Sequence, residues 1–207
     1  MAKKHGAYFI VDEVQTGVGA TGKFWAHEHW GLKDGEEPDF VTFSKKMQAS
    51  GIYHKKELRP NAAYRIYGTW MVRPHVVTPL SSMELSLTVQ GDPIRSLQAR
   101  KMIELIEKHD LVSHTSQIGT LLADNLKQIL SSSSTAQNLR GETKGTFMSW
   151  DFETPALRDG FVGKMRKEGI QMGGCGERSV RLRPMLTFGE QHVEILSEAV
   201  EKVLKGM

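Results

Sequence analysis

The sequence lacks three features that would assign it to a specialised class of protein. Its 207 residues contain a single cysteine, Cys175, so an internal disulfide framework is excluded and a reducing compartment is favoured. No apolar run approaches the roughly 18 residues that a membrane-spanning helix needs. The basic excess is small, 27 Lys and Arg against 24 Asp and Glu, and is mixed along the chain. The charge balance therefore gives no indication of nucleic-acid binding.

The chain also lacks a targeting peptide at its start. A few basic and small residues lead directly into the apolar run of residues 7–11. This beginning resembles the end of an amphipathic helix followed by a buried strand. We therefore expect that sequence is missing upstream, so the start leaves two intracellular compartments open, the cytoplasm and the mitochondrial matrix.

What is present is an ordinary globular composition, 39% hydrophobic and 25% charged, with the patterning of an α/β protein. Residues 7–11 show no apolar–polar alternation, which predicts a strand buried on both faces, as in a parallel sheet. Residues 41–43 predict a second short strand. No internal repeat is evident.

The remaining elements follow from periodicity and end signals. Thr154 and Pro155 predict a helix start, and Gly169 predicts its end. The sequence predicts a polar loop at residues 131–135, strands at 145–152 and 179–182, and helices near 94–106, 118–130, 155–168 and 190–204. We expect two domains, residues 1–109 from a large parallel-sheet domain and residues 110–207 as a small α/β domain.

Charged residues follow each of the first two predicted strands. Asp12 and Glu13 come after the first strand, and Lys45 and Lys46 come after the second. The carboxyl ends of parallel strands face one crevice, so an acid and a lysine would converge there. Pyridoxal phosphate needs such a pair, a carboxylate to keep the pyridine nitrogen protonated and a lysine to form a Schiff base. Composition alone favours the plainer interpretation, solvated loop charges.

Longer stretches decide between these interpretations. They are IVDEVQTG at residues 10–17, GKFWAHE at 22–28, TFSKKM at 42–47, HK at 54–55, LRPN at 58–61, YR at 64–65, TWM at 69–71, RG at 140–141, GGCG at 173–176 and VRLRP at 180–184. These stretches closely resemble the class III pyridoxal-phosphate-dependent aminotransferases, in the branch that acts on 4-aminobutyrate. The resemblance covers nearly the whole chain. It implies a remnant of the large parallel-sheet domain of the fold-type I aminotransferases, followed by their C-terminal small α/β domain.

The resemblance implies a role for individual residues toward pyridoxal 5'-phosphate. Asp12 would be the partner of the pyridine nitrogen, and Val14 would pack on the ring face. Gln15 would contact the phenolic oxygen. Lys45 would be the Schiff-base lysine, with Lys46 a solvated neighbour. Thr69 would reach the cofactor phosphate of the opposite subunit, so the family homodimer would share its active sites.

The resemblance also implies a substrate-binding residue and a reaction. Arg181 would pair with a glutamate when a ω-amine is accepted and bind carboxylate when an α-amino acid is accepted, an exchange that suits a guanidinium. Arg183 is the alternative within the motif. The implied reaction converts 4-aminobutyrate and 2-oxoglutarate to succinate semialdehyde and glutamate. The alternatives are a ω-aminotransferase of the ornithine or β-alanine type, or a non-catalytic fragment.

Three other motifs carry competing hypotheses. Residues 17–22 fit G-x-G-x-x-G, but intervening residues and the absence of a proper crossover helix disfavour a dinucleotide site. His27 and His29 have no third residue at metal-ligand spacing, so we expect packed or solvated histidines and no metal. Cys175 lies in a glycine-rich turn without a visible base, which favours a structural role.

The sequence departs from the family pattern in two ways. The phosphate cup, the aromatic ring cover, a second substrate arginine and the switch glutamate would all lie upstream, so we expect this chain alone to be inactive. Residues 72–90 have no counterpart in the family pattern. A valine codon begins with GT and a glutamine codon can be CAG, so a retained intron is our hypothesis, with a natural surface loop as the alternative.

Overall fold

The computed structural model describes residues 2–59 and 93–207. The chain divides into two compact units, the first made of Met1–Val18 and His27–His109 and the second of Gly19–Ala26 and Asp110–Met207. Thr69 and the segment of residues 72–90 lie outside the described residues. Within the described ranges, no helix has the length and apolar character required to cross a bilayer.

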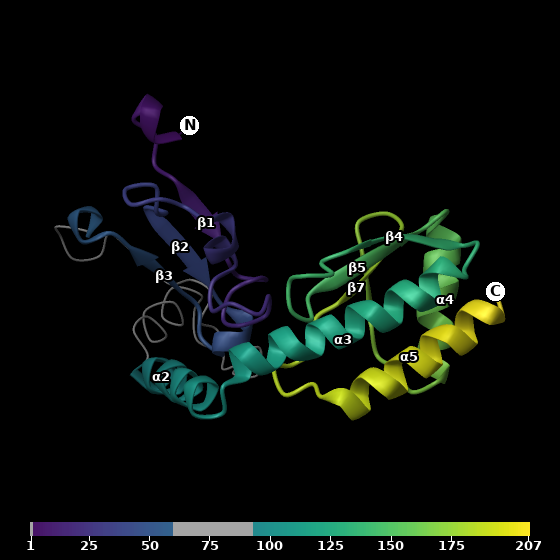
Figure 1. The fold of residues 1–207 in the computed structure, drawn as a ribbon. Coiled ribbons are helices and arrows are strands. Elements are labelled where there is room, and N and C mark those ends of the chain that lie inside the picture. Colours follow the sequence, from purple (N-terminus) through teal and green to yellow (C-terminus); the bar gives the residue numbers. More distant parts are fainter. Residues whose placement is uncertain (1, 60–92) are drawn as a thin grey trace, which may run out of the picture. The chain divides into compact units, whose positions relative to one another are not determined.

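The first unit contains a three-stranded sheet of order β1-β2-β3. Strand β1 (Ile10–Asp12) pairs in parallel with β2 (Phe40–Phe43), as the sequence predicts, and β2 pairs antiparallel with β3 (Gly51–His54). Figure 1 shows these strands in the purple and blue part of the chain. Short 3-10 helices connect them: η1 (Ala2–His5), η2 (Ala26–Trp30), η3 (Lys45–Met47) and η4 (Lys56–Leu58).

The prediction that the first strand is buried on both faces is wrong. Val11 is buried on one face, but Ile10 is 61% exposed on the other. Among the described residues, no element covers the Ile10 face. Of the apolar run at residues 7–11, only Ile10 and Val11 belong to β1, which ends at Asp12, so the run indicated a strand but overestimated its length at the N-terminal side and its burial.

Helix α2 (Pro93–Lys108) completes the described part of the first unit and confirms the helix predicted there. It packs near η3, and Arg95 Nη1 donates to the Gln48 carbonyl oxygen at 3.4 Å. Ile106 is fully buried, whereas Ile94 and Leu97 near the other end are exposed.

The second unit is a four-stranded antiparallel sheet with three helices. Its strand order is β4-β5-β7-β6, so β5 and β7 are central. The strands are β4 (Ala136–Arg140), β5 (Met148–Phe152), β6 (Gly173–Cys175) and β7 (Ser179–Leu182), and the helices are α3 (Leu111–Ser131), α4 (Pro155–Lys167) and α5 (Glu190–Lys205). Figure 1 shows α3 and α5 running side by side below the strands, with α4 at the right-hand end of the strands.

Local sequence signals explain the ends of α4. The Thr154 side chain accepts a hydrogen bond from the Leu157 amide at 3.2 Å, and Pro155 occupies the first helical turn, where its missing amide costs nothing. Gly169 has φ +82°, a left-handed conformation that glycine adopts without steric cost and that lies just beyond the helix end. The predicted helix is confirmed.

The core of the second unit lies between the sheet and the helices. On α3 the buried side chains recur at Ile118, Leu122, Leu126 and Leu130, which is one face of the helix. Strand side chains from β5 and β7 meet them, together with Phe161 of α4. Aromatic contacts add to this packing, since the ring centroids of Trp150 and Phe161 are 5.9 Å apart in a T-shaped arrangement. This core fixes the central strands, including the one that carries Arg181.

Candidate active site

The Asp12 carboxylate lies at the end of β1. Its Oδ1 accepts hydrogen bonds from Thr42 Oγ1 at 2.8 Å and from the Val14 amide at 3.0 Å. The Thr42 hydrogen bond, then the Val14 amide, hold the pKa of Asp12 below its usual value, and the positive charge of Lys45 acts in the same direction. The Asp12 carboxylate therefore stays ionised, and its side chain is exposed.

Lys45 follows the neighbouring strand β2 and begins the short helix η3. Its side chain is exposed, and its backbone has φ +45°, in the left-handed region. Its carbonyl oxygen accepts from the Gln48 amide at 2.9 Å and from Gln48 Nε2 at 3.3 Å, which holds this turn. A non-glycine residue in this region costs about 1–2 kcal/mol, and such strain is concentrated at functional sites. The two residues that follow, Lys46 and Met47, are half-buried and fully buried.

The parallel pairing of β1 with β2 brings Asp12 and Lys45 to one edge of the sheet. Asp12 is in register with Thr42, and Lys45 comes three residues later. In this arrangement the positive charge of Lys45 contributes to lowering the pKa of Asp12, after the hydrogen bonds from Thr42 and Val14. Val14 is half-buried and Gln15 is exposed, in the loop that follows Asp12. The first unit therefore brings four of the predicted site residues together.

A buried carboxylate that sequence reasoning missed anchors this loop. Glu13 is almost completely buried, and its Oε1 accepts from the His27 amide at 2.8 Å and lies 2.9 Å from His27 Nδ1. Its Oε2 accepts from Thr16 Oγ1 at 2.7 Å. The contact to a residue 14 positions away could not be read from spacing alone, although adjacency to Asp12 was a signal. Glu13 fixes the backbone on which Asp12 and Val14 are carried.

The histidine and glycine motifs have packing roles in the described structure. His27 is a partner of Glu13, and within residues 2–59 and 93–207 no three His, Cys, Asp or Glu side chains are placed so that they could hold a metal ion. In the second unit, a Cβ added to Gly22 would lie 3.0 Å from Ser116 Cβ of α3. The short 3-10 helix η2 follows this loop, whereas a dinucleotide fingerprint opens an α-helix. Gly19 and Gly22 therefore permit close packing against Val112 and Ser116 of α3.

Arg181 lies on β7 of the second unit, in register with Ser149 of β5 and Gly173 of β6. It lines a cavity of about 320 Å³ together with Arg183 and the apolar side chains of Met172 and Phe188. Desolvation, then the positive charge of Arg181, lower the pKa of Arg183 from its ordinary value. Two guanidinium groups on one partly apolar cavity would attract a carboxylate. The Arg181 guanidinium has no hydrogen bond or ion pair with another described side chain.

An ion pair on the same sheet stabilises the strand that carries Arg181. Arg140 Nη2 and Nη1 donate to the two oxygens of Asp151 at 2.6 and 2.8 Å. Ser179 Oγ donates to Asp151 at 2.6 Å, and Asn138 Nδ2 donates at 3.3 Å. The Arg140 hydrogen bonds hold the pKa of Asp151 far below its usual range. Arg140 stands out in the sequence only as part of a motif, because its partner Asp151 is 11 residues away.

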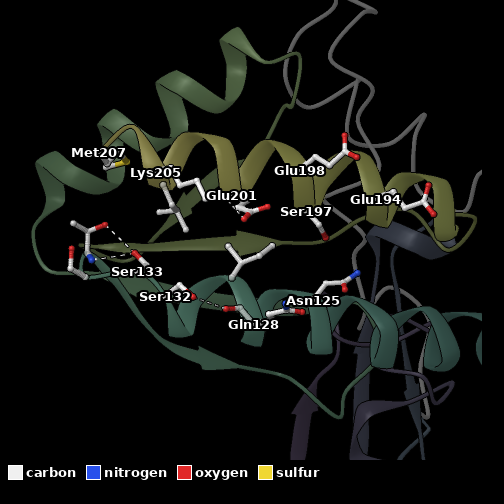
Figure 2. Close-up of a pocket in the computed structure, with 14 residues that line it drawn as sticks. Asn125, Gln128, Ser132, Ser133, Glu194, Ser197, Glu198, Glu201, Lys205 and Met207 are labelled. Carbon is white, nitrogen blue, oxygen red and sulfur yellow. Dashed lines mark hydrogen bonds and ion pairs between the residues drawn. The ribbon is translucent and has the colours of Figure 1, made fainter.

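A second cavity, of about 460 Å³, lies between α3 and α5 (Figure 2). Figure 2 shows Glu194, Glu198 and Glu201 along α5, opposite Asn125 and Gln128 of α3. Lys205 is paired with Glu201 at 2.6 Å, and none of the described residues that line the groove is an arginine. Its acidic wall would repel a carboxylate, so the Arg181 cavity is the better candidate for binding one.

Comparison with known proteins assigns the family. The family model for class III aminotransferases matches residues 1–204. Curated relatives include 4-aminobutyrate aminotransferases from Mycosarcoma maydis, 45% identical over 99% of this chain, and from Emericella nidulans, 46% identical over the whole chain. The mitochondrial 4-aminobutyrate aminotransferase of Sus scrofa is 38% identical over 99% of the chain. The chain spans 36–37% of the length of these three relatives.

Solved structures agree on the fold. A lysine aminotransferase from M. tuberculosis in the internal aldimine form matches 99% of this chain with a TM-score of 0.79 and 25% identity, over 43% of its own length. An ornithine aminotransferase from Plasmodium yoelii matches with a TM-score of 0.80 at 21% identity, over half of its length, and shows the fold alone. The predicted α/β class and the fold-type I remnant are confirmed. The chain belongs to the class III aminotransferases.

Proposed function

We propose that this chain carries the lysine-bearing part of a pyridoxal-phosphate-dependent enzyme that transfers the amino group of 4-aminobutyrate to 2-oxoglutarate. The observation that carries the proposal is the pair formed by Asp12 and Lys45 at adjacent parallel strand ends, one held anionic and the other exposed. Relatives named 4-aminobutyrate aminotransferase, at 38–46% identity, support the substrate. The complete enzyme would act as a homodimer.

The residues of the first unit fit the cofactor that this family resemblance implies. Within the described residues, Asp12 uses Oδ1 for its two hydrogen bonds, which leaves Oδ2 to accept one from a protonated ring nitrogen. The lowered pKa of Asp12 keeps the carboxylate charged for that role. Val14 would pack on the ring face, and the Gln15 amide would contact the phenolic oxygen. Thr69 would reach the phosphate bound by the opposite subunit.

Lys45 would hold the cofactor covalently and then move the substrate proton. When bound, pyridoxal phosphate supplies an electron sink that stabilises negative charge at the carbon losing its proton. Lys45 Nζ would accept that proton and return it to a different atom, as a general base and then a general acid. The Gln48 hydrogen bonds to the Lys45 carbonyl oxygen hold the backbone so that the side chain keeps its direction.

In the second unit, Arg181 would bind the substrate carboxylate. Its cavity provides apolar walls for a carbon chain and a second guanidinium, Arg183, that raises the local positive potential. A planar guanidinium can bind a carboxylate through two parallel hydrogen bonds, which orients as well as attracts the substrate. The acceptor 2-oxoglutarate and its product glutamate both carry a carboxylate next to the reacting carbon, so Arg181 would serve the half-reaction that converts one into the other.

The nearest alternative is another ω-aminotransferase. The structural match to a lysine aminotransferase favours this class of alternative, but at 25% identity it is a more distant similarity than the 4-aminobutyrate relatives. Substrate choice can be tested with a version of the protein extended upstream to the length of its relatives and lacking residues 72–90. Turnover of 4-aminobutyrate, ornithine, lysine and β-alanine would be compared, with 2-oxoglutarate as acceptor.

The proposal predicts preferred turnover of 4-aminobutyrate, measured as succinate semialdehyde in a coupled assay. The 207-residue chain, assayed beside the extended version with excess cofactor, should show little or no activity. Loss of several preorganised contacts at once lowers the rate by orders of magnitude. Equal turnover in the two proteins would refute the view that the chain is incomplete. Preference for another amine in the extended protein would refute the substrate.

A further inference from the structure

The strand that carries Arg181 belongs to a short hairpin. Strand β6 (Gly173–Cys175) and β7 (Ser179–Leu182) pair antiparallel and are joined by residues 176–178. Gly176 in the connection has φ +54°. β6 is the edge strand of the sheet and has only three residues, so its own ladder gives the hairpin little rigidity.

Arg158 of α4 reaches this hairpin from the helix. Its Nη1 donates to the carbonyl oxygens of Ser179 at 3.3 Å and Gly176 at 3.5 Å, at the two sides of the connection. Its Nε donates to Asp159 at 2.6 Å, and only 14% of its side chain is exposed. Each hydrogen bond to a carbonyl is long, but one half-buried cationic donor shared between the two carbonyl oxygens joins both sides of the connection to one helix.

Gly174 provides the space for this guanidinium. A Cβ added there would lie 2.3 Å from Arg158 Nη1 and 2.9 Å from Arg158 Cζ, which no real contact allows. The neighbouring Gly173 differs, because its nearest contact would be Arg181 Nε at 4.0 Å, an ordinary van der Waals distance. The close approach of Arg158 therefore requires glycine at position 174 specifically.

Ser179 is held on both of its polar groups. Its carbonyl oxygen accepts from Arg158, and its hydroxyl donates to Asp151, which Arg140 holds in turn. Arg181 follows two residues later and has no described side-chain partner of its own. The position of its guanidinium therefore depends on the backbone that these contacts fix.

We propose that Arg158 is a positioning residue for Arg181, acting through the carbonyl oxygens of Gly176 and Ser179 in a space that Gly174 leaves open. The inference rests on the proposed function, in which Arg181 binds the substrate carboxylate. Arg158 itself does not touch the substrate. It sets how well the hairpin presents Arg181 to a carboxylate in the cavity.

The test is a titration of the 207-residue chain with glutarate. Binding is measured from the shift of the NMR resonance of Arg181 Nε–Hε, which gives the Kd for glutarate. Outer contacts that orient a ligating side chain change affinity by about 10- to 100-fold at metal sites. Because Arg181 also keeps its backbone pairing with β5, we expect R158A to raise the Kd for glutarate about tenfold, at the lower end of that range. R158K, which keeps the charge but has a different donor geometry, should give an intermediate value.

Two further variants separate positioning from charge and from stability. Arg166 is an exposed arginine on the same helix, so R166A removes the same charge without touching the hairpin, and we expect less than about a twofold change. G174A displaces the Arg158 head group without removing it, and should weaken glutarate binding as R158A does. The double variant R158A/G174A should bind glutarate no more weakly than R158A does, because both substitutions remove the same contact between Arg158 and the hairpin. G174A and R158K carry the test if R158A does not fold.

The outcomes distinguish this inference from the proposed function. If R181A loses glutarate binding while R158A and G174A match R166A, the positioning role is overturned and the carboxylate role of Arg181 stands. If the wild-type chain does not bind glutarate, or R181A binds it equally well, the carboxylate role fails and the positioning role fails with it. A tenfold loss of glutarate affinity in R158A and in G174A, with the affinity of R166A unchanged, supports the positioning role of Arg158 and the carboxylate-binding role of Arg181.

Discussion

The ion pair between Arg140 and Asp151 gives the sharpest stability prediction. The Asp151 side chain is 11% exposed and that of Arg140 is 48% exposed. Removing one partner of a fully buried pair costs about 3–5 kcal/mol. Asp151 would keep its hydrogen bonds from Ser179 and Asn138 in R140A, and the pair is partly open to water. We therefore expect R140A to lower the free energy of unfolding by about 2 kcal/mol, a fall in Tm of about 4–8 °C.

The dependence of this effect on pH follows from the pKa of Asp151. The Arg140 hydrogen bonds lower that pKa in the folded protein, so the stabilisation is fully present above the unfolded pKa of about 3.9. It is lost as the pH falls from there toward the folded pKa, by up to about 1.4 kcal/mol for each pH unit. The difference in unfolding free energy between wild type and D151N should therefore shrink between pH 4 and pH 3.

The assay is urea unfolding of wild type, R140A, D151N and the double variant at pH 7, 4 and 3. The double-mutant cycle isolates the pair interaction, which we expect to be about 1–2 kcal/mol at pH 7. The many carboxyl groups that titrate in all four proteins cancel in the differences. A coupling below about 0.5 kcal/mol at pH 7, or a difference between wild type and D151N that does not change from pH 4 to pH 3, would refute the reasoning.

Two further predictions concern the second unit and the unmatched segment. G22A should lower the free energy of unfolding by more than about 2 kcal/mol, because Gly22 has φ +77° and an added Cβ would press on Ser116 of α3. The control G35A, also at positive φ but in open space, should lower it by only about 1 kcal/mol in the same urea titration. Equal losses of unfolding free energy in the two variants would contradict the packing argument. Deleting residues 72–90 should raise the Tm or leave it unchanged, because the family pattern needs no segment there; a clear fall in Tm would contradict the insertion hypothesis.

Local signals explain which parts of the fold could be predicted. The capping hydroxyl of Thr154 and the glycine at position 169 act within a few residues, so the ends of α4 were readable from the sequence. Strands β3, β4 and β6 were not predicted. β6 is Gly-Gly-Cys and has no apolar alternation. Pairing with β7 makes it a strand, and that pairing is a property of the folded sheet.

The same distinction holds for the candidate site. Asp12 and Lys45 could be placed together because parallel strands present their carboxyl ends at one edge, a rule that needs only strand positions. Glu13, Asp151 and Arg158 were missed because their roles depend on partners distant in sequence, such as Ser179, which lies 28 residues from Asp151. The exposure of Ile10 was not predicted, because an apolar sequence shows that a strand can be buried but not which elements cover its faces. Among the described residues, no element covers the Ile10 face.

The central claim is that Lys45 is the lysine that holds the cofactor, with Asp12 beside it. The most direct measurement is borohydride reduction of the upstream-extended protein after loading with pyridoxal phosphate, followed by peptide mapping. The account predicts a stoichiometric label on Lys45, retained in K46A and lost in K45A. Label on Lys46, or label spread over exposed lysines with no preference for Lys45, would contradict it.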